Sequence, residues 1–140
     1  MKIIIAIDSF KGSLTSAEAG KAAKEAIFQV NPEWQVNIIP IADGGEGMLS
    51  VMLNATQGTT HTLWAHNPCM ELTPAEYGIS NDGRTAFIEM AAISGLPLIR
   101  EEQRNPMRTT TYGTGELIRD ALEKGCQKFI VGIGGSATND

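Results

Sequence analysis

The sequence predicts an α/β protein with a doubly wound, flavodoxin- or Rossmann-like parallel sheet and a mixed or antiparallel β insertion. Buried-strand patterns at residues 2–7 and 128–133 each lead into a polar loop that contains glycine. Strands of a parallel sheet behave in this way before a crossover helix. Helical periodicity accompanies these strands, except between residues 59 and 90, where three β segments follow one another without a helix.

The first third of the chain alternates strands and helices. Residues 2–7 (KIIIAI) form a nearly continuous apolar run, typical of a strand buried on both faces. Apolar residues at helical spacing predict a helix over 16–30. Residues 35–41 indicate a second strand, in which Pro40 marks a sheet edge or strand end. A glycine-rich loop then leads into a second helix that ends before Gly58.

The rest of the chain contains β segments and one longer helix. Segments 59–66, 72–79 and 84–90 read as strands, the last two joined by a tight turn at 81–83. A helix is predicted over 113–124, with Gly125 as its C-cap and an Asp120–Lys124 pair on its outer side. Residues 128–133 form the last predicted strand.

These elements suggest a domain division. Residues 1–58 and 106–140 are assigned to a parallel α/β domain, and residues 59–105 to a β-rich insertion or the start of a second domain. The last strand opens into a glycine-rich loop that no helix follows. We therefore expect the chain to be truncated, with the remainder of the fold missing after residue 140.

Composition narrows the function classes. The 140 residues carry 16 acids against 11 bases, a formal charge of −5, and the bases are scattered singly. Nucleic acid is therefore not an expected partner. No window approaches the ~20 apolar residues of a membrane span. The two cysteines have no metal-ligand spacing, which favours reduced thiols in a cytoplasmic protein.

Three polar loops follow predicted strands: residues 8–13, 43–47 and 134–140, called here the first, second and third loops. Open parallel sheets bind ligands at the carboxyl ends of their strands. We therefore expect the three loops to converge on one site.

The first loop offers Asp8, Ser9 and Lys11 before a helix start. The lysine suits a phosphate or carboxylate, and Asp8 suits a metal or a hydroxyl group. A plain polar turn is the alternative, in which the helix is merely capped by Ser13, Thr15 or Ser16.

The second loop has three glycines within residues 44–47, which allow a ligand to approach the backbone closely. Its acids, Asp43 and Glu46, would repel a bare phosphate but suit Mg²⁺, a substrate hydroxyl or proton transfer. In the alternative, this is a tight turn in which the helix dipole favours Glu46.

The third loop follows the pattern G-x-G-x-x-A at Gly132, Gly134 and Ala137, a weak match to dinucleotide-binding loops. A phosphate cradle of backbone N–H groups, Ser136 and Thr138 explains it equally well. No Walker A motif is present. Thr111 or Thr114 is interpreted as a simple cap of the last helix. Glu89, at a strand end, has two open interpretations: it faces the same cleft as the three loops, or it is solvated, as glutamates at strand ends usually are.

Five segments, spread from end to end of the chain, form one ordered set: DSFKGSL at 8–14, PIADGGEG at 40–47, IEMAAISGL at 88–96, YGTGELI at 112–118 and GIGGSATND at 132–140. In this order they resemble the bacterial glycerate kinase family of the glycerate 2-kinase type.

The resemblance implies a two-domain α/β kinase that transfers a phosphoryl group from ATP to D-glycerate. It implies Mg²⁺ as cofactor and 2-phosphoglycerate as the product. It implies catalytic roles for Lys11, Asp8 and Asp43. The remaining implied contacts are Ser9, Gly44, Gly45 and Glu46 to substrate, Gly134, Gly135, Ser136 and Asn139 to the nucleotide phosphates, and Asp140 to the metal.

Two other hypotheses remain at this stage. One is a dinucleotide- or nucleotide-binding module, based on the third loop. The other is a non-enzymatic fragment of a disrupted gene. We also expect the 140-residue chain alone to be inactive, because half a site neither excludes water nor holds ATP in line.

Overall fold

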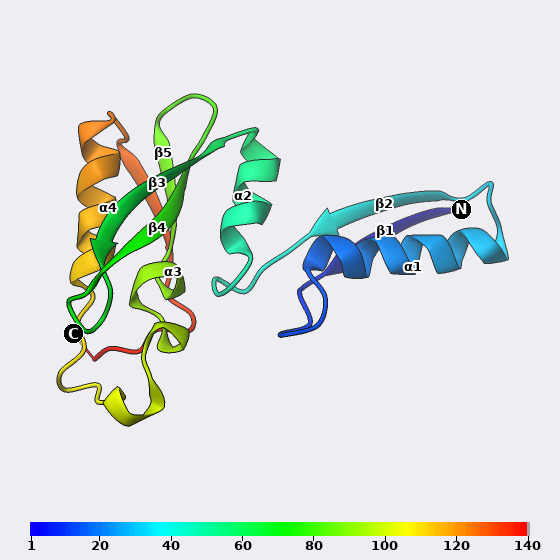
Figure 1. Ribbon diagram of the computed structural model, residues 1–140. Coiled ribbons are helices and arrows are strands. Elements are labelled where there is room, and N and C mark those ends of the chain that lie inside the picture. Colours follow the sequence, from blue (N-terminus) through cyan, green and yellow to red (C-terminus); the bar gives the residue numbers. More distant parts are fainter. Residues whose placement is uncertain (140) are drawn as a thin grey trace. The chain divides into compact units, whose positions relative to one another are not determined.

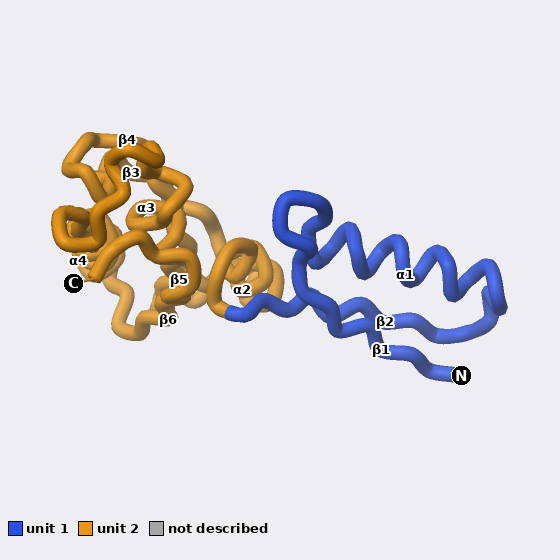
Figure 2. Tube along the Cα trace, turned by 90° about the horizontal axis from the view of Figure 1, so that it is seen from below, with its two compact units in different colours: residues 1–43 blue, residues 44–140 orange. Residues whose placement is uncertain are grey.

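A computed structural model describes residues 1–139 as a mixed α/β structure with parallel and antiparallel strand pairs, which confirms the predicted fold class. The chain divides into two compact units, Met1–Asp43 and Gly44–Asp140 (Figure 2). The domain division expected from the sequence, with residues 59–105 set apart, remains a prediction.

The first unit is a strand–helix–strand motif (Figure 1). Strand β1 (Lys2–Ile7) pairs in parallel with β2 (Gln35–Pro40), and helix α1 (Ser16–Val30) packs against both strands. Gly20 of α1 is buried against Ile38, where a Cβ atom would lie 2.5 Å from the Ile38 side chain. A small residue at this position therefore lets the helix approach the sheet.

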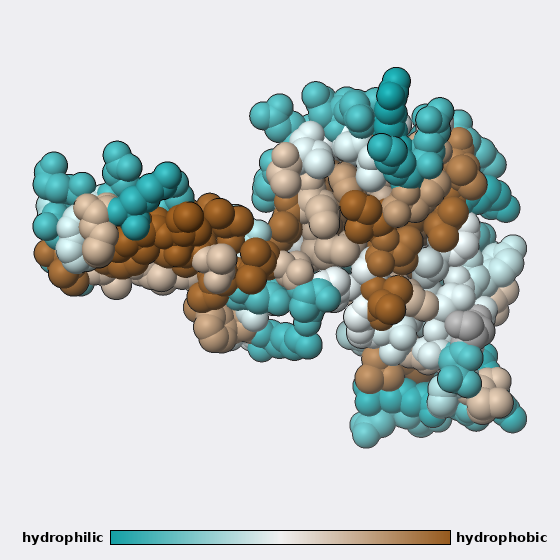
Figure 3. Space-filling model, turned by 180° about the vertical axis from the view of Figure 1, so that it is seen from behind, coloured by the Kyte–Doolittle hydropathy of each residue, from teal (hydrophilic) through white to brown (hydrophobic). Residues whose placement is uncertain are grey.

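Only one face of β1 and β2 is covered within this unit. Ile4 and Ile39 remain 59% and 49% exposed on the other face, and an apolar strip is visible along the unit in Figure 3. The sequence predicted that the first strand is buried on both faces, and the unit taken by itself does not show this.

The second unit contains a mixed sheet of order β3-β4-β5-β6. Strands β3 (Thr59–His66), β4 (Leu72–Ile79) and β5 (Thr85–Glu89) are antiparallel, whereas β6 (Lys128–Gly132) runs parallel to β5. The last strand thus pairs with the last of the three β segments that follow one another without a helix, through residues 85–89 and 128–132.

Two helices flank this sheet, α2 (Met48–Thr56) and α4 (Tyr112–Glu123), as Figure 1 shows. The short helix α3 (Ala91–Ser94) and two 3-10 turns, η1 (Leu96–Leu98) and η2 (Glu101–Gln103), follow β5. The core lies between α4, α3 and the sheet, and its largest fully buried side chains include Tyr77, Ile88, Ile93 and Leu117. Within residues 1–139, no helix is long and apolar enough to cross a membrane.

Candidate functional site

In the first unit, the carboxyl ends of β1 and β2 lie at one edge, as parallel pairing requires. The Ile41 N–H donates to the Ile7 carbonyl at 3.3 Å, which extends the pairing just beyond the strands. Asp8 follows β1, and Asp43 comes soon after β2. The Asp8 carboxylate accepts the Ser9 N–H at 2.6 Å. The first loop and the start of the second therefore leave the same edge of this sheet.

Lys11 lies in a tight turn at this edge. The Ser13 N–H donates to the Phe10 carbonyl at 2.8 Å, the Phe10 N–H donates to the Leu14 carbonyl at 2.8 Å, and Gly12 adopts a left-handed φ of 74°. The Lys11 side chain is exposed, and among residues 1–139 it makes no ion pair. The turn thus holds an accessible cation at a strand end.

Helix capping explains only part of the first loop. Thr15 is the N-cap of α1 and forms a capping box with Glu18. The Ser16 hydroxyl donates to the Ile7 carbonyl at 2.6 Å, which fastens the helix start to the end of β1. These two contacts leave Asp8, Ser9 and Lys11 without a capping role.

In the second unit, the glycines of the second loop contact the start of the third. The Gly134 N–H donates to the Gly44 carbonyl at 3.1 Å. A Cβ atom on Gly134 would lie 2.8 Å from the Gly45 Cα, and one on Gly132 would meet the Gly44 carbonyl oxygen and, at 2.8 Å, the Met48 sulfur. The two backbones therefore approach as closely as they do only because these positions lack side chains.

Conformation accounts for other glycines of the second loop. Gly44 and Gly47 have φ values of 92° and 93°, which other residues rarely adopt. Gly47 is the N-cap of α2, and its carbonyl accepts the Ser50 hydroxyl at 2.9 Å. Glu46, just before this cap, is exposed. The turn therefore presents an acid close to the amino end of α2.

The third loop is held against the segments that follow β5. The Ala137 N–H donates to the Ser94 carbonyl at 3.0 Å, and the Gly135 carbonyl accepts the Leu96 N–H at 3.1 Å. The Thr109 hydroxyl donates to the Ala137 carbonyl at 2.7 Å. The N–H groups of Gly134 and Ala137 are thus committed to protein carbonyls, so a phosphate cradle here would depend on the other groups of the loop.

The other predictions for the third loop have different outcomes. Ser136 and Asn139 are exposed, and Asp140, assigned to the metal, lies outside the described residues. The first two glycines of the G-x-G-x-x-A pattern pack on residues 44–48. Their presence is explained by this packing without a dinucleotide.

The sequence did not predict the contacts of two carboxylates. Glu89, for which a place facing the cleft and a solvated place were both open, is partly buried and accepts the Leu49 N–H at 2.6 Å. Glu116 accepts both the backbone N–H of His66, at 2.8 Å, and its ring Nδ1, at 3.0 Å. Each pair joins residues far apart in the chain, which local patterns do not reveal. Burial opposes the ionisation of Glu116, but the hydrogen bonds from His66 outweigh it and lower the pKa of this carboxyl.

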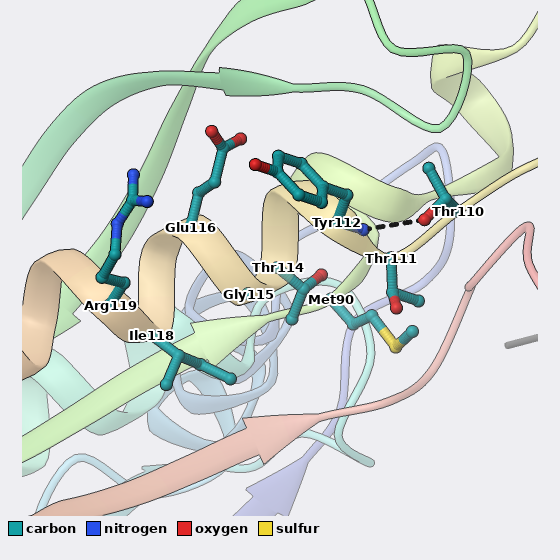
Figure 4. Close-up of a pocket in the computed structure, with 9 residues that line it drawn as sticks. All are labelled: Met90, Thr110, Thr111, Tyr112, Thr114, Gly115, Glu116, Ile118 and Arg119. Atoms are coloured by element: carbon teal, nitrogen blue, oxygen red, sulfur yellow. Dashed lines mark hydrogen bonds between the residues drawn. The ribbon is translucent and has the colours of Figure 1, made fainter.

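The predicted caps of α4 are also only partly correct. Thr111 is the N-cap residue but makes no side-chain capping hydrogen bond, and the buried Thr114 hydroxyl is 2.8 Å from that of Ser94. The Thr110 hydroxyl accepts the Tyr112 N–H at 3.2 Å (Figure 4). Thr110 therefore supplies a side-chain acceptor at this helix start.

An open depression of about 610 Å³ lies beside the amino-terminal half of α4 (Figure 4). Its lining residues are Met90, Thr110, Thr111, Tyr112, Thr114, Gly115, Glu116, Ile118 and Arg119. None of the site residues expected from the sequence is among them. The depression is therefore not lined by residues of the first, second or third loop.

The fold and these turns define an α/β protein whose ligand-binding candidates are acidic and glycine-rich loops at strand ends. The sequence model of the Glycerate kinase family matches residues 3–140. The chain belongs to the glycerate kinase family.

Curated relatives and a solved structure agree with this assignment. The chain is 51% identical to Glycerate 2-kinase of Escherichia coli (strain K12) and 50% identical to Glycerate kinase of Bacillus subtilis (strain 168), in each case over 100% of this chain and 37% of the relative. A crystal structure from Salmonella typhimurium LT2, assigned as a glycerate kinase 2, superimposes with a TM-score of 0.87 at 47% identity, over 100% of this chain and 37% of that one. The chain thus spans well under half the length of these relatives.

Proposed function

We propose that the protein containing this chain transfers the γ-phosphoryl group of ATP to D-glycerate, with 2-phosphoglycerate as the product. The observation that carries this proposal is the family match over residues 3–140. The exposed Lys11 offers a positive charge to the anionic substrate, and the exposed acids of the glycine turn offer acceptors for its hydroxyl groups. Phosphoryl transfer requires positioning and charge neutralisation more than covalent chemistry.

On the substrate side, Lys11 would neutralise an anionic group, either the carboxylate of glycerate or the transferred phosphate. Asp8 and Asp43 would accept hydrogen bonds from the glycerate hydroxyls, and Glu46 would orient the substrate. The backbone of the second loop, together with Ser9, would complete the contacts through Gly44 and Gly45.

On the nucleotide side, the third loop would face the ATP phosphates. Ser136 and Asn139 are exposed and carry donors that suit phosphate oxygens. Gly134 and Gly135 would contribute by keeping the loop close to the backbone of its neighbours, since the Gly134 N–H already donates to Gly44.

The donor chemistry fits Mg²⁺, which binds carboxylate, phosphate and water oxygens. Asp8 and Asp43 offer such oxygens after β1 and β2, and residues 1–139 contain no cluster of three acidic, histidine or cysteine ligands. One or two carboxylates suffice when substrate phosphates and water complete the shell. When bound, the ion would offset charge on the ATP phosphates; Asp140 is a further proposed ligand.

The test uses this chain joined after residue 140 to the remainder of Escherichia coli Glycerate 2-kinase, called here the extended enzyme. It is incubated with Mg-ATP and D-glycerate, with the parent enzyme as positive control, and products are identified by ³¹P NMR. We expect ADP and 2-phosphoglycerate. A folded extended enzyme that forms no phosphoglycerate while the parent enzyme does so would contradict the proposal.

A further inference from the structure

The carboxylate of Glu89 connects the end of β5 to the first turn of α2. It accepts the Leu49 N–H at 2.6 Å, one of the amino-terminal N–H groups that have no partner within the helix. A carboxylate is also favoured there by the helix dipole. The amino end of α2 is thus provided with an anion from within the protein.

Glu89 also lies beside the strand from which the third loop departs. It is in register with Gly132 of β6, and the next residue, Met90, donates its N–H to the Gly132 carbonyl at 2.9 Å. Glu89 is therefore bound on one side to the helix that follows the second loop and placed on the other beside the start of the third.

The two loops have little room to change their separation. Gly134 donates to Gly44, and the would-be Cβ positions of Gly132 and Gly134 fall on atoms of Gly44, Gly45 and Met48. The hydrogen bond from the Leu49 N–H to Glu89 adds a further link, which joins the helix after the second loop to the end of β5. Glu89 therefore holds the first turn of α2, which directly follows the turn of residues 44–47.

We propose that Glu89 is a positioning residue that, through the first turn of α2, fixes the acidic turn of residues 44–47 against the third loop. The inference rests on the proposed function, because the turn is taken to bind glycerate. In this role Glu89 acts by accepting the Leu49 N–H, and it does not itself contact the substrate.

The test compares Glu89→Ala and Glu89→Gln in the extended enzyme, with Glu76→Ala, an exposed glutamate on β4, as the matched control. Glu89→Ala is expected to lower kcat/KM for D-glycerate roughly 10–100-fold, the usual effect of losing a supporting partner. Glu89→Gln keeps an oxygen acceptor and is expected to recover most of the loss. Both are assayed well below their melting temperatures.

Hydrogen exchange of the peptide that covers residues 47–53 provides a readout independent of turnover. In Glu89→Ala the exchange should be faster than in wild type and in Glu76→Ala. If kcat/KM of Glu89→Ala equals that of the control, or if Glu89→Gln is as impaired as Glu89→Ala, the positioning role is wrong. If the wild-type extended enzyme does not phosphorylate glycerate, the proposed function is wrong, and hydrogen exchange alone then tests the role of Glu89 in holding α2. Faster exchange of residues 47–53 in Glu89→Ala would support that role, and unchanged exchange would contradict it.

Discussion

The backbone N–H of Gly134 donates a hydrogen bond to the carbonyl oxygen of Gly44, so two glycine turns from opposite ends of the second unit lie in direct contact. The space beside Gly134 is already filled by the backbone of Gly45. Gly134 does not have a left-handed φ, so its backbone conformation does not require glycine. The requirement comes from the neighbouring backbone of Gly45, which leaves no room for a side chain.

Gly134→Ala should therefore destabilise the protein. The added Cβ would lie 2.8 Å from the Gly45 Cα, and relief of such a clash costs about 1–3 kcal/mol. The control is Gly115→Ala on α4, where a Cβ would meet no atom within 4 Å and where alanine favours the helix. Urea titration measures the free energy of unfolding of each variant, and we expect a lower value for Gly134→Ala than for Gly115→Ala. Equal values for the two variants would contradict the packing account.

The pair of Glu116 and His66 predicts a dependence of stability on acid. Because the pKa of Glu116 is lowered in the folded state, its ionised form stabilises the fold above the ordinary carboxyl pKa, and this contribution is lost as pH falls through the lowered value. Glu116→Gln should lower the free energy of unfolding by about 1–2 kcal/mol at pH 7. The difference from wild type should shrink on titration towards pH 3; a constant difference would contradict this account.

A hydrogen bond from Tyr77 to Asp120 predicts the opposite dependence at alkaline pH. The Tyr77 hydroxyl donates to Asp120 at 2.7 Å, and burial followed by this contact raises the pKa of Tyr77 well above its ordinary value. The stabilisation is present below about pH 10 and is lost as pH rises further. Tyr77→Phe should lower the free energy of unfolding by about 1 kcal/mol at pH 7. In chemical unfolding between pH 8 and 11, the difference in this free energy between wild type and Tyr77→Phe should narrow as pH rises. A difference that widens would contradict the stabilising role of this hydrogen bond.

Local patterns in the sequence identified most elements because each pattern is set by neighbouring residues. The helix expected over 16–30 is Ser16–Val30, and the turn at 81–83 has Gly83 at a φ of 70°. The Asp120–Lys124 pair forms at 2.6 Å. Gly125 has the left-handed φ of 96° typical of a helix end, one residue beyond the C-cap Lys124.

What the sequence left unpredicted depends on contacts between distant segments. No local pattern indicates that β6 pairs with β5, or that Glu89 reaches Leu49. The three expected loops are also seen in two separate groups: the first loop shares a strand edge with residues 41–43, and residues 44–45 contact the third. The convergence of all three stays a prediction.

The most direct test of the central claim measures steady-state kinetics of D-glycerate phosphorylation in the extended enzyme with Lys11→Ala. The control is Lys21→Ala, an exposed lysine on α1 whose side chain is 76% accessible. If Lys11 neutralises the substrate, its loss should lower kcat/KM about 100-fold or more, as for removal of a preorganised charge-stabilising group, while Lys21→Ala remains close to wild type. Equal kcat/KM values for Lys11→Ala and Lys21→Ala would contradict the account.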